Sequence, residues 1–139
     1  MKNAKLKLLE VPPSVNRMWR ATPSGNGKAR NVLSAEGRAW KEAAIYYLNP
    51  QKGIGDEKGF WGINVRIPGG PRQPDLDNFS KGILDALHEA RKTPDDRYLV
   101  QMHVEFYAGS IVEIEVWREP LLFWAAIKGT SKATIKTMI

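Results

Sequence analysis

The chain contains no cysteine and only two histidines, His88 and His103, among its 139 residues. The lack of cysteine excludes disulfides, zinc fingers, iron–sulfur clusters and thiol catalysis. Two histidines are too few for a multi-histidine zinc site within one chain. Metal chemistry in this protein must therefore depend on carboxylates, which are the preferred ligands of hard cations such as magnesium or manganese.

Long apolar runs are also missing from the sequence. The first residues, MKNAKLKLLEVPPS, have no apolar core long enough for a signal peptide. No window approaches the roughly 20 apolar residues of a membrane-spanning helix. We therefore expect a soluble, cytoplasmic protein without a membrane partner.

Positive charge is abundant: 21 Lys and Arg against 15 Asp and Glu give a formal net charge of +6 at pH 7. Such a surface favours a polyanionic partner, and nucleic acid is the first candidate. Hydrophobic residues make up 42% and charged residues 26% of the chain, as in a folded protein. The length suits one domain.

The hydrophobic pattern predicts a single small α/β (α+β) domain, in the order β-α-β-α-β-β, with two helices packed on a mixed sheet. Ser34 is the expected cap of the first helix, and a short hairpin turn, AGS, is expected between the last two strands. The predicted strands cover 4–11, 60–67, 97–107 and 111–117, and the predicted helices cover 35–48 and 76–90.

Two segments do not fit this alternation of strands and helices. Residues 21–31, ATPSGNGKARN, combine glycine, serine and basic side chains without apolar periodicity, and we interpret them as a mobile basic loop. From residue 119 the composition changes to a short apolar run followed by a basic, polar end. We therefore divide the chain into a domain of residues 1–118 and an extension of residues 119–139.

The stretch RQPDLDNFSK, residues 72–81, places two aspartates just ahead of the second predicted helix. While the chain is extended, Asp75 and Asp77 point to the same side. Once the helix has started, Asp77, Lys81 and Asp85 share one face, opposite the apolar stripe. The spacing therefore gathers carboxylates beside an ammonium group.

This group has two interpretations that the spacing does not separate. Aspartate at a helix start is a preferred cap, and Asp77 with Lys81 can be a simple ion pair. Alternatively, the carboxylates hold a hard cation against substrate phosphate while Lys81 neutralises a phosphate oxygen. Asp95 and Asp96 offer a further ligand in the second interpretation and a turn in the first. The remaining acidic group, His103, Glu105, Glu113 and Glu115, alternates with apolar residues and predicts a solvated sheet face.

Three motifs together resemble the RusA family of Holliday junction resolvases, which are small endodeoxyribonucleases typical of phages and prophages. The motifs are PPSVNRMWR at 12–20, DLDNFSKGILDAL at 75–87, and the aspartate pair at 95–96. Their order and spacing agree with the family over about residues 5–118. The resemblance implies a homodimer that binds four-way DNA junctions and, with Mg²⁺ or Mn²⁺, makes paired incisions in recombination and repair.

The resemblance also assigns roles to individual residues. It implies that Asp75, Asp77 and Asp96 form a metal-binding acidic centre and that Lys81 is needed for catalysis. Asp85 is either a fourth metal ligand or a residue that orients Lys81, and its place two turns into the helix favours the second role. Asn78 and Asp95 are expected to support the centre. Contacts with DNA are expected from Asn16, Arg17, Arg20, Lys28, Arg30 and Arg72. Two alternatives remain: a module that holds branched DNA without cutting it, and a phage accessory interaction protein.

Overall fold

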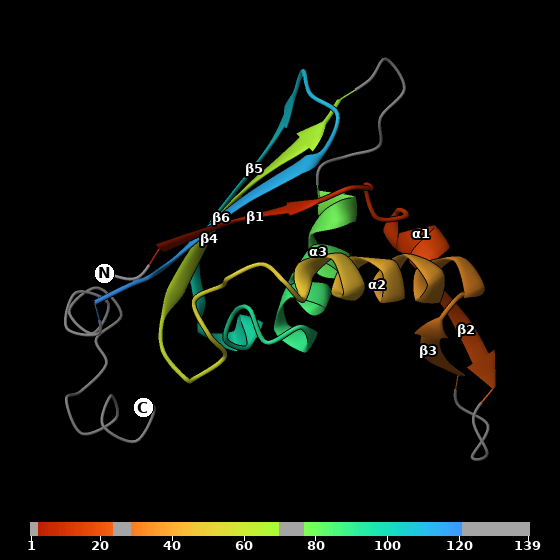
Figure 1. Cartoon of the computed structure of the whole chain (residues 1–139). Helices are drawn as coiled ribbons and strands as arrows, with labels where there is room; N and C mark the ends of the chain where they lie inside the picture. Colours follow the sequence, from red (N-terminus) through yellow and green to blue (C-terminus); the bar gives the residue numbers. More distant parts are fainter. Residues whose placement is uncertain (1–2, 24–28, 70–76, 121–139) are drawn as a thin grey trace.

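A computed structural model of the chain describes residues 3–23, 29–69 and 77–120 (Figure 1). Strands and helices alternate along most of this length, with one short 3-10 turn before the fifth strand. The elements are β1 (Asn3–Leu8), α1 (Val15–Met18), β2 (Trp19–Pro23), β3 (Ala29–Leu33), α2 (Ala35–Leu48), β4 (Trp61–Pro68), α3 (Asp77–Glu89), η1 (Asp96–Tyr98), β5 (Leu99–Tyr107) and β6 (Val112–Arg118).

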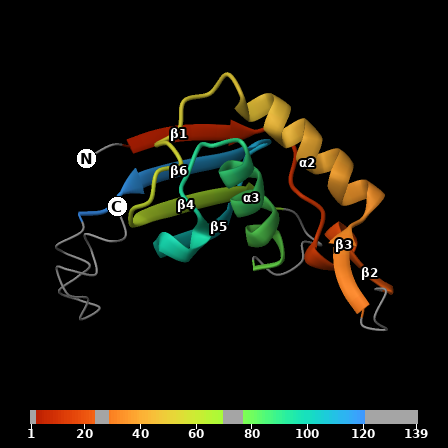
Figure 2. The same ribbon diagram turned by 90° about the horizontal axis from the view of Figure 1, so that it is seen from below.

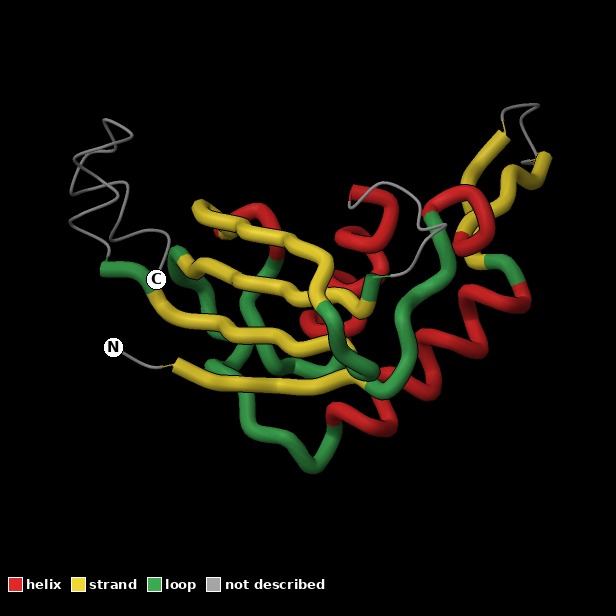
Figure 3. The backbone as a smooth tube through the Cα atoms, turned by 90° about the horizontal axis from the view of Figure 1, so that it is seen from above, coloured by secondary structure: helices red, strands yellow, loops and turns green. Residues whose placement is uncertain are grey.

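The main sheet has four strands in the order β1-β6-β4-β5. Strands β4 and β5 are parallel and are joined by α3, whereas β6 is antiparallel to both β1 and β4. Figure 3 shows these four strands side by side with the helices on one side of them. The predicted domain of two main helices on a mixed sheet is therefore confirmed.

The expected hairpin between the last two strands is wrong, because β4 lies between β5 and β6. The short connection joins two strands that are not neighbours. Strand β4 takes the central position because Ile63, Val65 and Ile67 are all buried, whereas Met102 on β5 is 37% exposed and suits an edge. The sequence predicted all three strands but not that the strand of residues 60–67 would lie between the last two.

Helix α3 lies across one face of the sheet, and α2 runs from beside β1 past the ends of the strands (Figure 2). Alternate strand residues such as Leu6 and Leu8 on β1 are buried under these helices, while Lys5 and Lys7 between them are exposed. From α3, Phe79, Ile83 and Leu87 enter the same core. The apolar stripe that the sequence predicted is therefore the face that anchors α3 to the sheet.

The predicted first helix is found with its predicted cap. Helix α2 begins at Ala35 and ends at Leu48, and the side chain of Ser34 accepts a hydrogen bond of 3.0 Å from the Gly37 N–H. Trp40 and Leu48 are buried on its inner side. Within the described residues, no helix is sufficiently long and apolar to cross a membrane.

The segment before α2 is more ordered than the sequence predicted. Helix α1 is followed by an antiparallel ribbon of β2 and β3, which projects beyond the sheet (Figures 1 and 2). Residues 21–23 and 29–31 lie in these strands, so the mobile-loop interpretation is wrong there, while 24–28 fall outside the described residues. A two-stranded ribbon is held mainly by backbone hydrogen bonds, which leave little apolar periodicity to detect.

Ser34 and Gly37 fasten this segment to α2. The Ser34 hydroxyl lies 2.5 Å and 3.1 Å from the carbonyl oxygens of Arg17 and Met18, and the Ser34 N–H donates to Met18 at 2.9 Å. A side chain at position 37 would bring its Cβ within 2.4 Å of the Met18 carbonyl oxygen. Glycine is therefore required where α2 meets the end of α1.

We predict that Gly37→Ala lowers the free energy of unfolding by about 1–3 kcal/mol, because backbone must move to admit the methyl group. Because alanine is the better helix former, helix propensity alone would raise the free energy of unfolding, and a decrease would point to the close approach. Gly82→Ala in α3 is the matched control, since its Cβ would meet only side-chain carbons, the nearest 3.4 Å away. Urea unfolding checks both variants, and an equally stable Gly37→Ala would contradict the required close approach.

Candidate active site

The exposed face of α3 carries the central residues of the predicted site. Lys81 is exposed and Asp85, one turn later, is half-buried, both on the side of α3 away from the buried stripe. The helix begins at Asp77, so the predicted four-residue spacing is present in its backbone. Asp75 and Arg72 fall outside the described residues, as do the side chains of Asp77 and Asn78.

Asp96 reaches the same helix from the short turn η1. It is exposed, and its negative charge acts on Asp85. The chain therefore brings Asp96 toward Asp85, which lies about 12 Å along the helix axis from Asp77 at 1.5 Å per residue. Among the described side chains, the predicted residues that come together are Lys81, Asp85 and Asp96.

Asp95 has a structural task at this point. Its side chain caps η1 by accepting a hydrogen bond of 3.0 Å from the Arg97 N–H. Its other carboxylate oxygen lies 4.0 Å from Nε2 of His88 on α3. The hydrogen bond from Arg97 and a second one with Asp96 lower the pKa of Asp95. Asp95 thus holds the turn that presents Asp96.

Asp85 is the titratable group of this face with a raised pKa. Burial is the main cause, since it disfavours the charged carboxylate. The charges of Asp96 and Glu89 raise the pKa further, whereas those of Lys41 and Lys81 lower it. Each lysine acts on Asp85 more strongly than either carboxylate does, so the raised pKa comes from burial, to which the repulsion by Asp96 and Glu89 adds.

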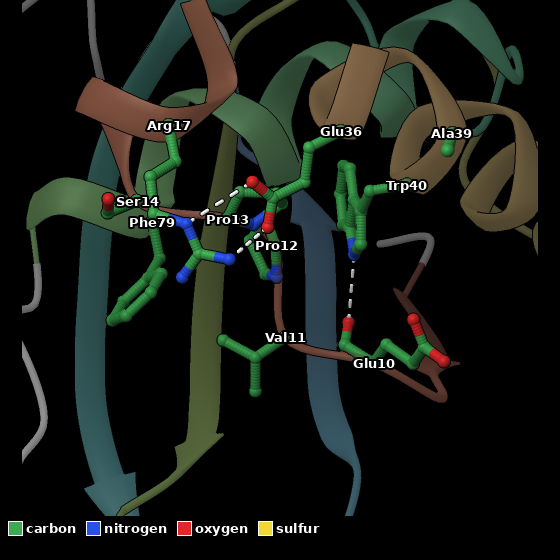
Figure 4. A pocket seen from close by; sticks show the side chains of 10 residues that line it. All are labelled: Glu10, Val11, Pro12, Pro13, Ser14, Arg17, Glu36, Ala39, Trp40 and Phe79. Atoms are coloured by element: carbon green, nitrogen blue, oxygen red, sulfur yellow. Dashed lines mark hydrogen bonds and ion pairs between the residues drawn. The ribbon is translucent and has the colours of Figure 1, made fainter. Parts of the chain in front are cut away.

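The N-terminal motif packs directly against α3. Pro12, Pro13, Trp40 and Phe79 line a pocket of about 540 Å³ between this motif, α2 and the first turns of α3 (Figure 4). Gly82 of α3 faces this motif, because a Cβ there would lie 3.4 Å from the side chain of Pro12, an ordinary van der Waals distance. Two segments that carry the family resemblance thus form one surface.

Arg17 lies at the mouth of this pocket. Figure 4 shows its guanidinium group bound to the carboxylate of Glu36, with Phe79 on one side and Trp40 on the other. The pair is bidentate, with Arg17 Nε 3.2 Å from one carboxylate oxygen and Arg17 Nη2 bound to the other. Its side chains are 67% and 45% exposed, so it remains accessible to a ligand.

Three of the expected DNA-binding residues are placed by the structure. Asn16 and Arg17 on α1 and Arg20 on β2 are all exposed. The backbone of Arg30 lies in β3, opposite Thr22, but its side chain is not described. Lys28 and Arg72 fall outside the described residues.

The remaining acidic group lies on the open face of the sheet, as predicted. Arg66 in β4 bridges two strands, with 3.2 Å to Glu105 and 3.7 Å to Glu113. The register also pairs Lys5 with Glu115 across β1 and β6. Throughout the described ranges, no three acidic or histidine side chains lie close enough together to hold a metal ion.

One neighbour of the site was not predicted from the sequence. The ammonium of Lys81 lies over the ring of Trp19, with Nζ 4.4 Å from the ring centroid. Trp19 is the first residue of β2 and is half-buried against the core. The sequence feature that could have indicated Trp19 is its place in the PPSVNRMWR motif, directly after residues expected to touch DNA.

The fold and site define a class: a small α+β protein with a net positive charge that places carboxylates beside a lysine on an exposed helix face. A sequence model of the family described as Endodeoxyribonuclease RusA matches residues 10–117. The chain therefore belongs to the RusA family and is an endodeoxyribonuclease, a hydrolase that resolves Holliday junctions. A comparison with curated proteins finds no match.

We predict that Asp85→Asn raises the free energy of unfolding at pH 7 in metal-free buffer. The folded pKa of Asp85 lies above its ordinary value of 3.8, so the charged carboxylate makes folding less favourable. Below pH 3.8 the carboxyl is protonated in both states, and the gain should vanish as the pH falls through the raised pKa. Urea unfolding across this range checks it, with Glu42→Gln as the exposed control. A gain that did not change with pH would rule out this cause.

Proposed function

We propose that this protein is a magnesium-dependent resolvase that makes paired incisions in four-way DNA junctions. Family membership carries the general activity. The observation that supports the finer proposal is the gathering of Lys81, Asp85 and Asp96 on one face of α3, the helix that starts at Asp77. A bare cluster of carboxylates would repel DNA, so this face requires a cation to accept a phosphodiester.

Asp75, Asp77 and Asp96 are the proposed ligands of Mg²⁺, with Mn²⁺ as a substitute. The donor set fits such an ion, because Mg²⁺ prefers carboxylate oxygens and retains several waters. The repulsion between Asp96 and Asp85 is of the kind that a divalent cation relieves. A bound divalent ion would supply an activated water and stabilise charge on the phosphate.

Lys81 is the proposed partner of the scissile phosphate. Its exposed ammonium can neutralise a non-bridging oxygen as negative charge develops there in the transition state. Asp85, one turn further along α3, attracts this ammonium and is proposed to orient it. Asn78 and Asp95 support the centre from its edges.

The segment from α1 into the β2–β3 ribbon is the proposed DNA track. Phosphate contacts position DNA without reading its sequence. Arg17 is paired with Glu36 in the DNA-free protein, so a phosphate must replace that carboxylate to use its bidentate guanidinium. The proposed contacts are Asn16, Arg17, Arg20, Lys28, Arg30 and Arg72.

We predict that Asp75→Asn, Asp77→Asn or Asp96→Asn each slows junction cleavage by about 100-fold or more. Wild-type protein with a synthetic four-way junction should nick it with Mg²⁺ and not with a chelator. Glu42→Gln, at an exposed position of α2, should cleave normally. The readout is the rate of strand cleavage on a denaturing gel, with binding measured in parallel.

The same assay separates the alternatives. Binding without nicking would identify a module that only holds branched DNA. Neither binding nor nicking would identify an accessory interaction protein. Nicking that survives in all three variants would contradict the proposed metal ligands while leaving the family activity intact.

A homodimer is the proposed functional unit, because paired incisions in opposing strands need two sites. We propose that residues 1–118 form the nuclease domain and that the extension 119–139 stabilises the dimer. Glu119 itself belongs with the domain, since it accepts a hydrogen bond of 2.7 Å from the Trp117 indole and donates its N–H to Phe60.

We predict that deleting residues 121–139 shifts the protein from dimer toward monomer, because the apolar run LLFWAAIK is removed with the tail. The deletion keeps Glu119 so that the domain edge is unchanged. Sedimentation velocity over a range of concentrations gives the association state. A truncated chain that dimerises as strongly as the full chain would exclude this role for the extension.

A further inference from the structure

Two unlike neighbours act on the ammonium of Lys81. On one side the aromatic ring of Trp19 lies with its centroid 4.4 Å from Nζ, within the range of a cation–π interaction. The negative charge of Asp85, one turn along α3, also attracts it. A lysine on an exposed helix face would otherwise sample many rotamers of its flexible four-carbon stem.

The position of Trp19 is fixed by the backbone around it. The preceding residue, Met18, accepts a hydrogen bond from the Ser34 N–H, and the absence of a side chain at Gly37 brings α2 against the Met18 carbonyl. Trp19 also pairs with Leu33 at the base of the β2–β3 ribbon. The ring is thus held by elements that are separate from α3.

A hydrogen bond from the indole does not account for this placement. The Trp19 Nε1 atom is buried and has no hydrogen-bond partner among the described atoms. Leaving such a donor unpaired is unfavourable. The face of the ring, by contrast, contacts the charged ammonium of Lys81.

We propose that Trp19 is a positioning residue for Lys81, which rests on the proposed function of Lys81 at the scissile phosphate. The ring restricts the ammonium to one location without using its three N–H donors in strong hydrogen bonds. Those donors remain free for Asp85 and for a phosphate oxygen. Because Arg17 and Arg20 flank Trp19 closely in sequence and are exposed, one short segment both contacts DNA and places the lysine.

The test compares Trp19→Leu, which removes the π face but keeps apolar bulk, with Trp19→Phe, which keeps an aromatic face. Single-turnover cleavage of a four-way junction at saturating protein should slow about tenfold in Trp19→Leu. In Trp19→Phe the rate should stay within about threefold of wild type. The junction Kd measured in chelator should be unchanged within about twofold in both, since positioning acts on kcat rather than on binding.

A spectroscopic measurement reports the contact without requiring catalysis. In protein labelled with ¹³C-lysine, the ε-methylene protons of Lys81 should be shifted upfield by the ring current of Trp19. Lys81→Arg identifies the resonance. The shift should persist in Trp19→Phe and disappear in Trp19→Leu. Because the shift is measured in wild-type protein, the proposal is testable even if Trp19→Leu does not fold, which urea unfolding would reveal.

The outcomes separate this inference from the function on which it rests. If Lys81→Ala cleaves like wild type, the catalytic role of Lys81 is wrong. If Lys81→Ala is inactive but Trp19→Leu cleaves at the wild-type rate, only the positioning role of Trp19 is wrong. An unshifted Lys81 resonance in wild-type protein would overturn the contact itself, and equal losses in Trp19→Leu and Trp19→Phe would mark a merely structural ring.

Discussion

The close approach of α2 to the end of α1 is the constraint on which the site depends. Gly37 has no side chain, so the start of α2 lies against the Met18 carbonyl, and Ser34 binds the same backbone from the cap position. This junction fixes the direction in which β2 leaves α1. It therefore sets where Trp19 meets Lys81 and where the side chain of Arg17 meets Glu36.

In the protein without ligands, one charged group on α3, the carboxylate of Asp85, is in an unfavourable environment. The carboxylate of Asp85 is half-buried, and its attraction to Lys41 and Lys81 is opposed by the charges of Asp96 and Glu89. Lys41 also forms an ion pair with Glu89, which divides its charge between two partners. A chain that carries a net charge of +6 thus keeps a locally unfavourable negative group at one place. A charged group whose environment lowers the free energy of unfolding is typical of functional sites.

The parts of the fold that the sequence predicted are those governed by local periodicity. Helix α2 was predicted with its bounds because a serine cap and an apolar stripe are both local signals. The position of β4 between β5 and β6 was not, because strand order depends on contacts between distant segments. In the site, helical spacing predicted that Lys81 and Asp85 share one face. The contact with Trp19 was not predicted, because Trp19 belongs to a ribbon whose sequence has almost no apolar periodicity.

The crossover from β4 to β5 explains why Asp96 arrives where it does. Helix α3 must run back along the sheet so that β5 can pair in parallel with β4, and η1 then lies beyond the C-terminal end of the helix. Asp77 stands at the helix start, where the macrodipole favours a negative charge. Asp85 lies two turns away and receives no such help. The returning chain therefore brings the charge of Asp96 toward the half-buried carboxylate of Asp85, and a cation held by Asp96 would offset the repulsion between them.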